Sequence, residues 1–409
     1  MASNYTTNTN NSNTTNSKST SDSRFSRMGA KVGITLAATT NFFKRNIRQA
    51  LDSGNTGKYS IYALIFLIVM LILFYMYKIA TYTKTHCGYI NSIYTERASI
   101  ANLDVEKYKD FKLRDFYIRT AYNCCAIGNF TNTFVDLCAL DAILKQGVRC
   151  LDFEIYAVDN KPVVAVSAND GYYFKQSFNY LSASDVLNYI GTYAFSGAIC
   201  PNYMDPLILH FRLKTKLVPI INLLGKDIKN ILGDRLLDNN YNDAYFGKNL
   251  GGVSISNFMK KIIIAVNIHN QEVLKADKLM KVTNIESGSP FFRMLRKDDV
   301  LHTPSSNEIT EYNKQNMSIA LPDVSYSTEN LPFHLCLEYG IQMIGMCYQN
   351  FDPNMELCAE FFGENNSAFV LKPESLRYEP IVIEKPKPLP KDVSFKPRHI
   401  QKPYYSFKI

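Results

Sequence analysis

Residues 341–377 read IQMIGMCYQNFDPNMELCAEFFGENNSAFVLKPESLR. The stretch opens on an apolar run typical of a buried strand, continues as an amphipathic helix at 352–365, and ends on a second apolar run at 368–373. A strand, a helix and another strand in this order are typical of parallel strands joined by a right-handed crossover. The stretch therefore predicts an α/β fold.

The same alternation runs through the chain upstream of this stretch. Predicted strands lie at 116–123, 148–158, 161–167, 205–211, 260–268, 318–324, 341–349 and 368–373, with predicted helices at 133–147, 182–195, 217–237, 332–340 and 352–365. Seven or eight such units in about 260 residues favour a closed (β/α)8 barrel. An open doubly wound sheet is the alternative, but the chain has no glycine-rich phosphate-binding turn to support it.

The N-terminal region predicts a membrane anchor. Residues 61–79 read IYALIFLIVMLILFYMYKI, which is long and apolar enough to cross a bilayer core, and tyrosines lie near both ends of the run. The segment before it carries Lys44, Arg45 and Arg48, which predict either a solvated juxtamembrane helix or contact with anionic lipid headgroups. We therefore predict a single-pass membrane protein.

Two signals disagree about the side of the membrane on which the folded domain lies. More Lys and Arg residues precede the span than follow it, which predicts a cytosolic N-terminus and a domain on the opposite side. The sequons at Asn129, Asn316 and Asn365 agree with that placement. Several cysteines, however, lie in apolar strand-like runs, as buried free thiols of a reducing compartment do. The sequence leaves the orientation open.

Composition argues against several classes of function. A net charge of +8 over 409 residues is too small to indicate nucleic-acid binding. Nine cysteines without a CxxC pair, and six scattered histidines, argue against a structural zinc site. With 46% hydrophobic residues, the chain can bury a core without a disulfide framework.

These patterns give an organisation in eight parts. They are a disordered Asn/Ser/Thr-rich tail at 1–23, a basic juxtamembrane segment at 24–58, a transmembrane helix at 59–80, a connector at 81–111, a half barrel at 112–269, a linker at 270–305, a second half barrel at 306–376 and a Pro- and Lys-rich tail at 377–409.

Four stretches carry a resemblance to a known family. NKPVVAV, DPLILHF with IKNILGDRLL, and KKIIIAV resemble the X region of phosphoinositide-specific phospholipase C, and residues 341–377 resemble the end of its Y region. On these motifs the chain is identified as a member of that family over residues 112–376. The resemblance implies a distorted TIM barrel in two halves around a linker, with the transmembrane helix in place of the family's accessory modules.

The composition of the chain also carries a resemblance that concerns its source. It has 27 Tyr and 25 Phe but no Trp, and many Asn, Lys and Ile residues, which is typical of an AT-rich genome. A degenerate barrel without accessory modules resembles membrane proteins of large DNA viruses. This resemblance implies a virion membrane or a host-cell membrane.

Both catalytic histidines of the family are replaced in this chain. The family cleaves a phosphodiester with two histidines and a calcium ion held by Asn and carboxylates. By the resemblance, Tyr122 stands where the general-acid histidine would be, and Val166 stands where the second histidine would be. A tyrosine with a pKa of about 10 is a poor acid–base group at neutral pH, and valine transfers no proton.

The calcium-binding positions are only partly retained. Asn123 matches a family ligand, and Asp152 and Glu154 keep the charges of the family's Glu-x-Asp pair with their lengths exchanged. Arg212 stands in place of the last carboxylate, and His210 shares its strand face. We therefore expect no cofactor, with calcium only if the site is active.

The degenerate site predicts a membrane-anchored, catalytically inactive phospholipase C-like domain that acts as a structural or interaction module with an unknown protein partner. One alternative is an active phosphodiesterase that uses Asn123, Asp152, Glu154 and His210 with a metal. Another is a phosphoinositide-headgroup binding module, against which the loss of the family's phosphate-binding lysines argues.

The two retained carboxylates allow one structural prediction. Asp152 and Glu154 lie two residues apart on a strand and point to the same face, where they repel each other unless a cation joins them. We expect Arg212 to pair with one or both and to fill the place of the metal. The alternative is that Arg212 points to solvent at the barrel rim while the carboxylates accept from backbone amides.

Overall fold

The computed structural model describes residues 44–46, 48, 56–171, 174–380, 386–387, 390, 393 and 395–409. It divides into two compact units, Met1–Thr81 and Tyr82–Ile409, which are described separately. The tail predicted at 1–23 and most of the basic segment at 24–58 lie outside the described residues. Within that segment Lys44, Arg45 and Arg48 are described as helical and exposed.

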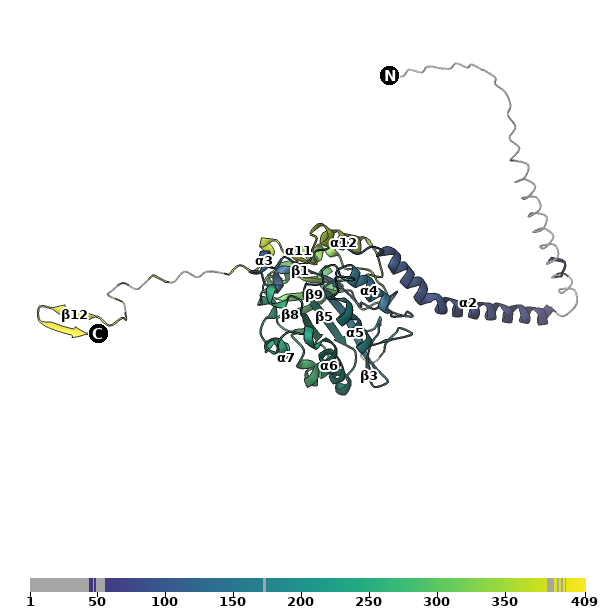
Figure 1. Ribbon diagram of the computed structural model, residues 1–409, viewed down its shortest axis with the longest axis horizontal. Helices are drawn as coiled ribbons and strands as arrows, with labels where there is room; N and C mark the ends of the chain where they lie inside the picture. The colour runs from purple at the N-terminus through teal and green to yellow at the C-terminus, as the bar shows by residue number, and fades with distance from the viewer. Residues whose placement is uncertain are drawn as a thin grey trace, which may run out of the picture. The chain divides into compact units, whose positions relative to one another are not determined.

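One long helix, α2 (Thr56–Ile93), carries the predicted span (Figure 1). Its Gly57–Ile93 part is the one helix of the described residues that is long and apolar enough to cross a membrane, by length and composition. Large apolar side chains along it are exposed, as at Ile61, Leu67 and Phe74. The helix continues beyond the predicted end at residue 80, so it takes up the first part of the expected connector.

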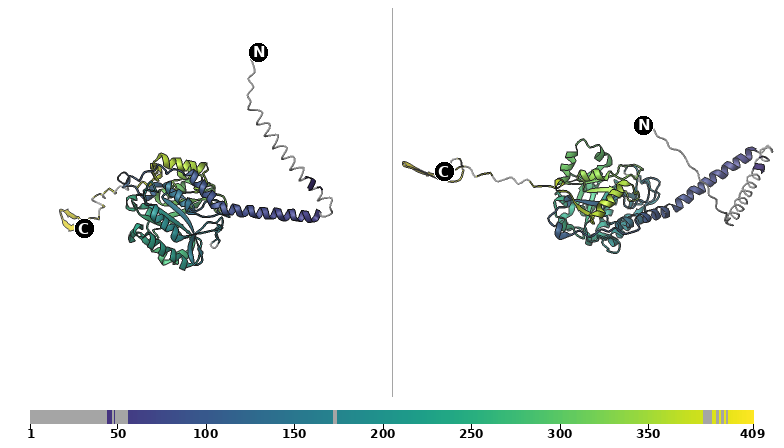
Figure 2. Two further views of the ribbon diagram at one scale, coloured as in Figure 1. Left: turned by 45° about the vertical axis from the view of Figure 1, so that its right-hand side comes forward. Right: turned by 90° about the horizontal axis from the view of Figure 1, so that it is seen from above.

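Eight parallel strands form a nearly closed barrel, which confirms the predicted fold class (Figure 2). Around the ring the order is β7 (Ile285–Ser287), β6 (Ile262–Asn267), β5 (Leu207–Leu213), β2 (Cys150–Val158), β1 (Phe116–Ala121), β10 (Met343–Met346), β9 (Met317–Leu321) and β8 (Phe292–Arg296). Among the described residues no parallel ladder joins β7 to β8, and the turn between them is linked by the antiparallel bridge Ser289–Phe292. Strands from both halves of the chain therefore share one sheet.

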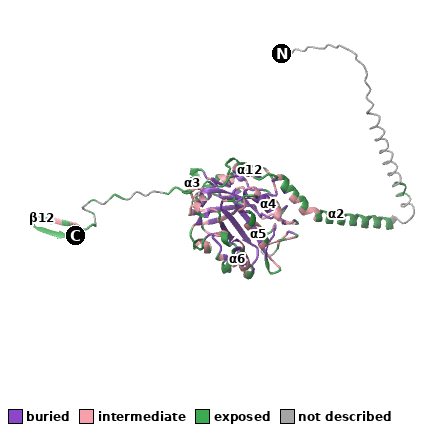
Figure 3. Cartoon of the chain, in the orientation of Figure 1, coloured by how far each residue is buried: buried purple, intermediate pink, exposed green. Residues whose placement is uncertain are grey.

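All barrel strands except β7 and β8 are buried on both faces along most or all of their length, as parallel strands covered by helices are (Figure 3). All six residues of β6 and all seven of β5 are buried. The longer helices around the strands are α4 (Leu137–Lys145), α5 (Ala183–Tyr193), α6 (Val218–Leu232), α10 (Ser306–Gln315), α11 (Phe333–Glu338) and α12 (Pro353–Glu364). The apolar faces of these helices pack against the outside of the strands and complete the core.

Local signals fix where these helices begin and end. The carboxylate of Asp136 accepts a hydrogen bond from the backbone N–H of Cys138 (2.9 Å) and starts α4. Asp352 caps α12 in the same way through Met355 (3.0 Å). Gly147, with φ of +69°, follows α4 in the left-handed conformation that glycine adopts without strain.

Short helices complete the connections between these elements. They are α3 (Val105–Tyr108), α7 (Asn242–Tyr245), α8 (Asp277–Met280) and α9 (Lys297–Leu301), with 3-10 turns at Leu113–Asp115, Gly233–Arg235, Asn239–Tyr241, Leu250–Gly252, Ile255–Phe258, Gln271–Lys275 and Glu374–Leu376.

Two predicted strands are not part of the parallel ring. β3 (Lys161–Val164) pairs antiparallel with β2 and with β4 (Leu181–Ser182), because Asp159 and Asn160 both have positive φ and form a tight hairpin turn. β11 (Phe369–Leu371) runs antiparallel to β1. It has room there because β2 pairs only with the second half of β1, which leaves Phe116–Ile118 with a free edge.

Two segments for which the sequence predicts no regular structure contain strands. The expected linker at 270–305 holds the barrel strands β7 and β8, which are too short and too polar to give a clear periodic signal. The expected tail at 377–409 ends in a hairpin of β12 (His399–Lys402) and β13 (Tyr405–Lys408). Both corrections concern short strands, which form because they pair with another strand and not because of a strong local pattern.

Deleting residues 59–80 should convert the protein from membrane-bound to soluble without unfolding the barrel, because the side chains removed are exposed rather than part of the core. Flotation on a lipid gradient measures the first effect, and the melting temperature of the soluble chain measures the second. Deletion of residues 1–23 is the control and should leave the chain membrane-bound. Aggregation of the chain lacking 59–80 would show that this segment belongs to the fold.

Candidate functional site

The retained site residues are brought together by the register of two neighbouring strands. In the parallel pair of β2 and β5, Asp152 lies opposite His210, and Glu154 lies opposite Arg212. Side chains two apart on a strand share a face, so all four point to one side of the sheet. Asn123 follows β1 with φ of 47°, a left-handed conformation that asparagine tolerates.

The guanidinium of Arg212 lies between both carboxylates. Its Nη2 donates to Asp152 Oδ2 (2.7 Å), its Nε donates to Asp152 Oδ1 (3.0 Å), and its Nη1 donates to Glu154 Oε1 (2.6 Å). Nη2 also donates to Asn123 Oδ1 (2.9 Å). Arg212 is only 3% exposed, so the ion pair expected from the sequence is present, and the solvent-facing alternative is wrong.

The two carboxylates also accept hydrogen bonds from groups other than Arg212. Glu154 Oε2 accepts from the hydroxyl of Tyr156 (2.9 Å) and from the backbone N–H of Ser167 (3.1 Å). Asp152 Oδ2 accepts from the backbone N–H of Asn123 (3.2 Å). Both carboxylates thus satisfy the rule that buried charges are paired and hydrogen-bonded.

His210 is completely buried, and both of its ring nitrogens are occupied. Nδ1 lies 2.7 Å from Asp152 Oδ1, and Nε2 lies 2.7 Å from the hydroxyl oxygen of Ser287. An ionised carboxylate can only accept, so Nδ1 carries the proton. A ring that has a fixed partner at each nitrogen orients Asp152 and has no nitrogen directed at a substrate.

The two positions that the resemblance aligns with histidines, Tyr122 and Val166, are both buried. Burial raises the pKa of Tyr122 to about 12 despite the opposing charge of Arg212, and the guanidinium stacks 4.6 Å from the centre of the Tyr122 ring. Tyr122 is therefore neutral at physiological pH and packs on Arg212. Val166 is buried and contributes an apolar side chain.

The electrostatics of the cluster favour the charged pair. Burial opposes ionisation of Asp152, but the charge of Arg212 and the hydrogen bonds from His210 and Arg212 outweigh it and hold its pKa well below the usual 3.8. Burial likewise opposes the charge on Arg212, yet Asp152 and the neighbouring Tyr122 and Glu154 raise the pKa of Arg212. Each partner therefore remains ionised because of the other.

The residues present do not fit a calcium ion. Calcium takes six to eight oxygen ligands. The oxygens of Asn123, Asp152 and Glu154 that could supply them are directed at the guanidinium of Arg212. A divalent ion in this place would meet a permanent positive charge, and the unpaired buried atom of Asn123 is its Nδ2, a donor that binds no cation.

A cavity of about 490 Å³ lies next to this cluster, and Arg212 is the one predicted site residue that lines it. Its other lining residues are Asp170, Leu213, Lys214, Asn267, His269, Asn270, Gly288, Met294, Arg296 and Asp299. Lys214 Nζ lies 2.7 Å from Asp170 Oδ1, and Arg296 Nη2 lies 3.7 Å from the same oxygen. Asp170 therefore partly neutralises the positive charges of Lys214 and Arg296 in the cavity.

Sequence reasoning missed most of this cavity lining. The alternation of side chains along β5 could have identified Lys214, because Lys214 lies on the same strand face as His210 and Arg212. Arg296 had no comparable signal, since it lies in the segment predicted to be a linker. His269 and Asn270 follow β6 in a loop that no periodic pattern marks.

Comparison with known proteins supports the family suggested by the motifs. Residues 266–375 match the family model described as "Phosphatidylinositol-specific phospholipase C, Y domain". This range runs from the end of β6 through the 3-10 turn after β11, and it includes β7 and β8. No curated protein matches the chain.

Two solved structures share the fold of the barrel. Crystal structures of PLC21 from L. pealei and from S. officinalis match with TM-scores of 0.54 and 0.53 and sequence identities of 19% and 18%. Each match covers 66% of this chain but only 38% of the longer PLC21 chain. A calcium-dependent phosphoinositol-specific phospholipase C from Pseudomonas sp. matches with a TM-score of 0.39 and 13% identity over 62% of this chain and 95% of its own.

The barrel, the matched Y domain and the likeness to the PLC21 fold agree with one another. Residues 266–375 of the chain are thus similar to the Y domain of phosphatidylinositol-specific phospholipase C, and the barrel that contains them has a fold like that of PLC21.

Proposed function

We propose that the chain is a membrane-tethered phospholipase C-like module that does not hydrolyse phosphodiesters and acts through interaction or structure. The observation that carries the proposal is the buried guanidinium of Arg212, bound by Asp152, Glu154 and Asn123. A permanent cation within the protein pairs with both carboxylates, which would otherwise be available to a metal. The chain's own residues thus hold the cluster together without an exchangeable ion.

The chemistry of the neighbouring groups supports the same proposal. Hydrolysis of a phosphodiester needs a group that moves a proton near neutral pH. Tyr122 holds its proton, Val166 has none to give, and both nitrogens of His210 are engaged. The alternative of an active phosphodiesterase built on Asn123, Asp152 and His210 would require Arg212 to leave the cluster.

The apolar part of α2 supports the membrane tether, and the exposed Lys44, Arg45 and Arg48 support contact with anionic headgroups. Composition supports a virion or host-cell membrane of a large DNA virus as the setting. In this arrangement the barrel is a module displayed at a membrane, where a protein partner of unknown identity binds it.

Vesicles test the absence of hydrolysis. The full chain, inserted in vesicles of phosphatidylinositol and phosphatidylinositol 4,5-bisphosphate with calcium, should release no inositol phosphate above the level of protein-free vesicles. An active calcium-dependent phospholipase C in the same vesicles is the positive control. Calcium-dependent release that Asp152→Asn abolishes would contradict the proposal and favour the active phosphodiesterase.

Substitution of Arg212 tests the role of the cluster. Arg212→Ala leaves two buried carboxylates without their cation and should reduce the free energy of unfolding by about 3–5 kcal/mol. The matched control is Arg293→Ala, which removes a partly exposed pair with Glu308 and should cost about 1 kcal/mol or less. Urea unfolding of both variants measures the difference, and equal losses would contradict the role of Arg212.

The same variant has a defined pH dependence. Because the pKa of Asp152 is lowered in the folded protein, its contribution to stability is present above the ordinary value of 3.8 and is lost as the pH falls below it. The stability difference between wild type and Arg212→Ala should therefore be largest near neutral pH and shrink below about pH 4. A difference independent of pH would show that the lost packing, not the charge, decides the effect.

The cavity supports a second candidate, a module that binds inositol phosphate headgroups. Lys214 and Arg296 line it beside His269 and Asn270, and its volume of about 490 Å³ lies in the range of small-molecule sites. The ion pairs to Asp170 oppose anion binding in the wild type.

Asp170→Asn should therefore raise the affinity for inositol 1,4,5-trisphosphate, measured by calorimetry, because it frees both cations. Adding Lys214→Met to that variant is the control and should remove the gain. If Asp170→Asn gives no heat, headgroup binding at this cavity is excluded as the function.

A further inference from the structure

The nine cysteines divide by burial. Seven are free, and all seven are buried: Cys124, Cys125, Cys150, Cys200, Cys336, Cys347 and Cys358. Burial raises the pKa of each of these thiols, which keeps them in the unreactive thiol form. Thiols of this kind survive in an oxidising compartment as well as in a reducing one. The free cysteines therefore no longer argue against a barrel outside the cytosol.

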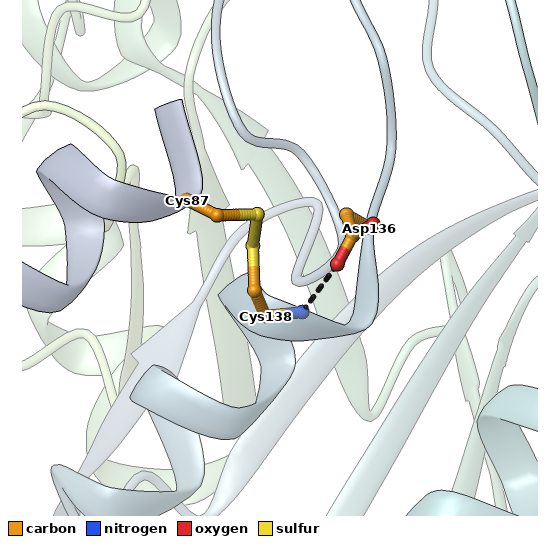
Figure 4. A group of neighbouring side chains, drawn as sticks. All are labelled: Cys87, Asp136 and Cys138. Carbon is orange, nitrogen blue, oxygen red and sulfur yellow. Dashed lines mark hydrogen bonds between the residues drawn. A yellow bond between two sulfur atoms is a disulfide. The ribbon is translucent and has the colours of Figure 1, made fainter. Parts of the chain in front are cut away.

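The two cysteines that are only half-buried are joined to each other. Cys87 and Cys138 form a disulfide across 51 residues of sequence (Figure 4). Cys87 lies near the end of α2, and Cys138 lies in the first turn of α4. Close by, the hydroxyl of Tyr82 hydrogen-bonds to that of Thr133 (3.1 Å), so the last turns of α2 are already held against this side of the barrel.

Asp136 lies close to Cys87 and Cys138, and side chains of these three types can bind a metal ion. Its carboxylate, however, already accepts the backbone N–H of Cys138 as the cap of α4 (Figure 4). Two sulfur atoms bonded to each other also offer no thiolate to a metal. The geometry of this group favours the disulfide.

The three sequons of the barrel unit differ in how accessible the amide nitrogen is. The side chain of Asn129 is exposed and has no hydrogen-bond partner among the described residues. Asn365 is exposed, but its Nδ2 donates to the carbonyl of Phe361 (2.8 Å). Asn316 is half-buried, and its Oδ1 accepts from Asn249 (3.1 Å). Asn129 is thus the one best placed for modification.

We propose that the barrel lies on the exoplasmic, oxidising side of the membrane, where Cys87 and Cys138 form a disulfide and Asn129 carries an N-linked glycan. The excess of Lys and Arg before the span, at Lys44, Arg45, Arg48 and Lys58, places the N-terminus in the cytosol and agrees with this orientation. The inference rests on the membrane tether proposed above and is independent of whether the barrel hydrolyses lipid.

Both modifications use co-reactants of known chemical class. The two thiols give up two protons and two electrons to the disulfide of a thiol oxidoreductase, which becomes a dithiol. The glycan comes from a lipid-linked oligosaccharide pyrophosphate. A bond forms between the first sugar carbon and Nδ2 of Asn129, the bond from that carbon to the pyrophosphate oxygen breaks, and the lipid pyrophosphate leaves with the amide proton.

Glycosylation of the full chain tests the orientation. The sequon reads Asn129-Phe130-Thr131, so Thr131→Ala removes it without touching the asparagine, and Thr131→Ser preserves it as the matched control. In a eukaryotic cell the wild type and Thr131→Ser should shift on treatment with an N-glycosidase, and Thr131→Ala should lose that shift.

The N-terminal tail carries sequons at Asn4, Asn10 and Asn13, so a glycan on the tail would indicate the opposite orientation. A glycan that persists in Thr131→Ala and disappears when these three asparagines are replaced by Gln would overturn the proposal. A wild-type chain without any glycan would overturn it as well.

Counting thiols tests the disulfide. After denaturation without reductant, a maleimide reagent should label seven thiols, and after reduction it should label all nine. Cys138→Ser should give eight with or without reductant, whereas the buried control Cys200→Ser should give six and eight. Nine reactive thiols without reductant, or two thiols released by a chelator instead of a reductant, would overturn the proposal.

Discussion

A buried arginine holds the centre of this barrel together. Asp152 and Glu154 project from one strand into the interior, where two carboxylates without a cation would repel each other and lose their hydration. Arg212, on the neighbouring strand, supplies that cation from within the chain and donates to both. Its charge is permanent because guanidinium does not deprotonate in proteins. Both carboxylates therefore have a cationic partner before any ion or ligand arrives.

This arrangement links the architecture of the barrel to the proposed loss of hydrolysis. The parallel register that sets Glu154 opposite Arg212 also sets Asp152 opposite His210, so both cross-strand partners lie within hydrogen-bond distance of the carboxylates. Tyr122 packs against the guanidinium, and Ser287 occupies the second nitrogen of His210. The cavity remains, with Lys214 and Arg296 beside Asp170. The fold thus keeps the shape of a binding site while its central polar groups bind one another.

Much of the fold could be predicted because helices and long buried strands have strong periodic patterns. The alternation at 341–377 and its upstream repeats gave the barrel class, and the apolar run at 61–79 gave the long helix that α2 contains. The failures were short elements. β7 has three residues and lies in the expected linker, while β3 and β11 have the composition of ring strands but pair antiparallel. Local composition does not determine which neighbouring strand a segment pairs with, or in which direction.

For the candidate site, the sequence by itself determined which side chains share a face. The two-residue spacing of Asp152 and Glu154, and of His210 and Arg212, follows from strand geometry alone and led to the expected ion pair. Only the tertiary structure decided which other groups complete the cluster, among them Tyr156, Ser167 and Ser287. It also decided the pairing of Cys87 with Cys138. These partners come from separate strands, loops and helices, and contacts between distant segments arise from packing, which no local period in the sequence records.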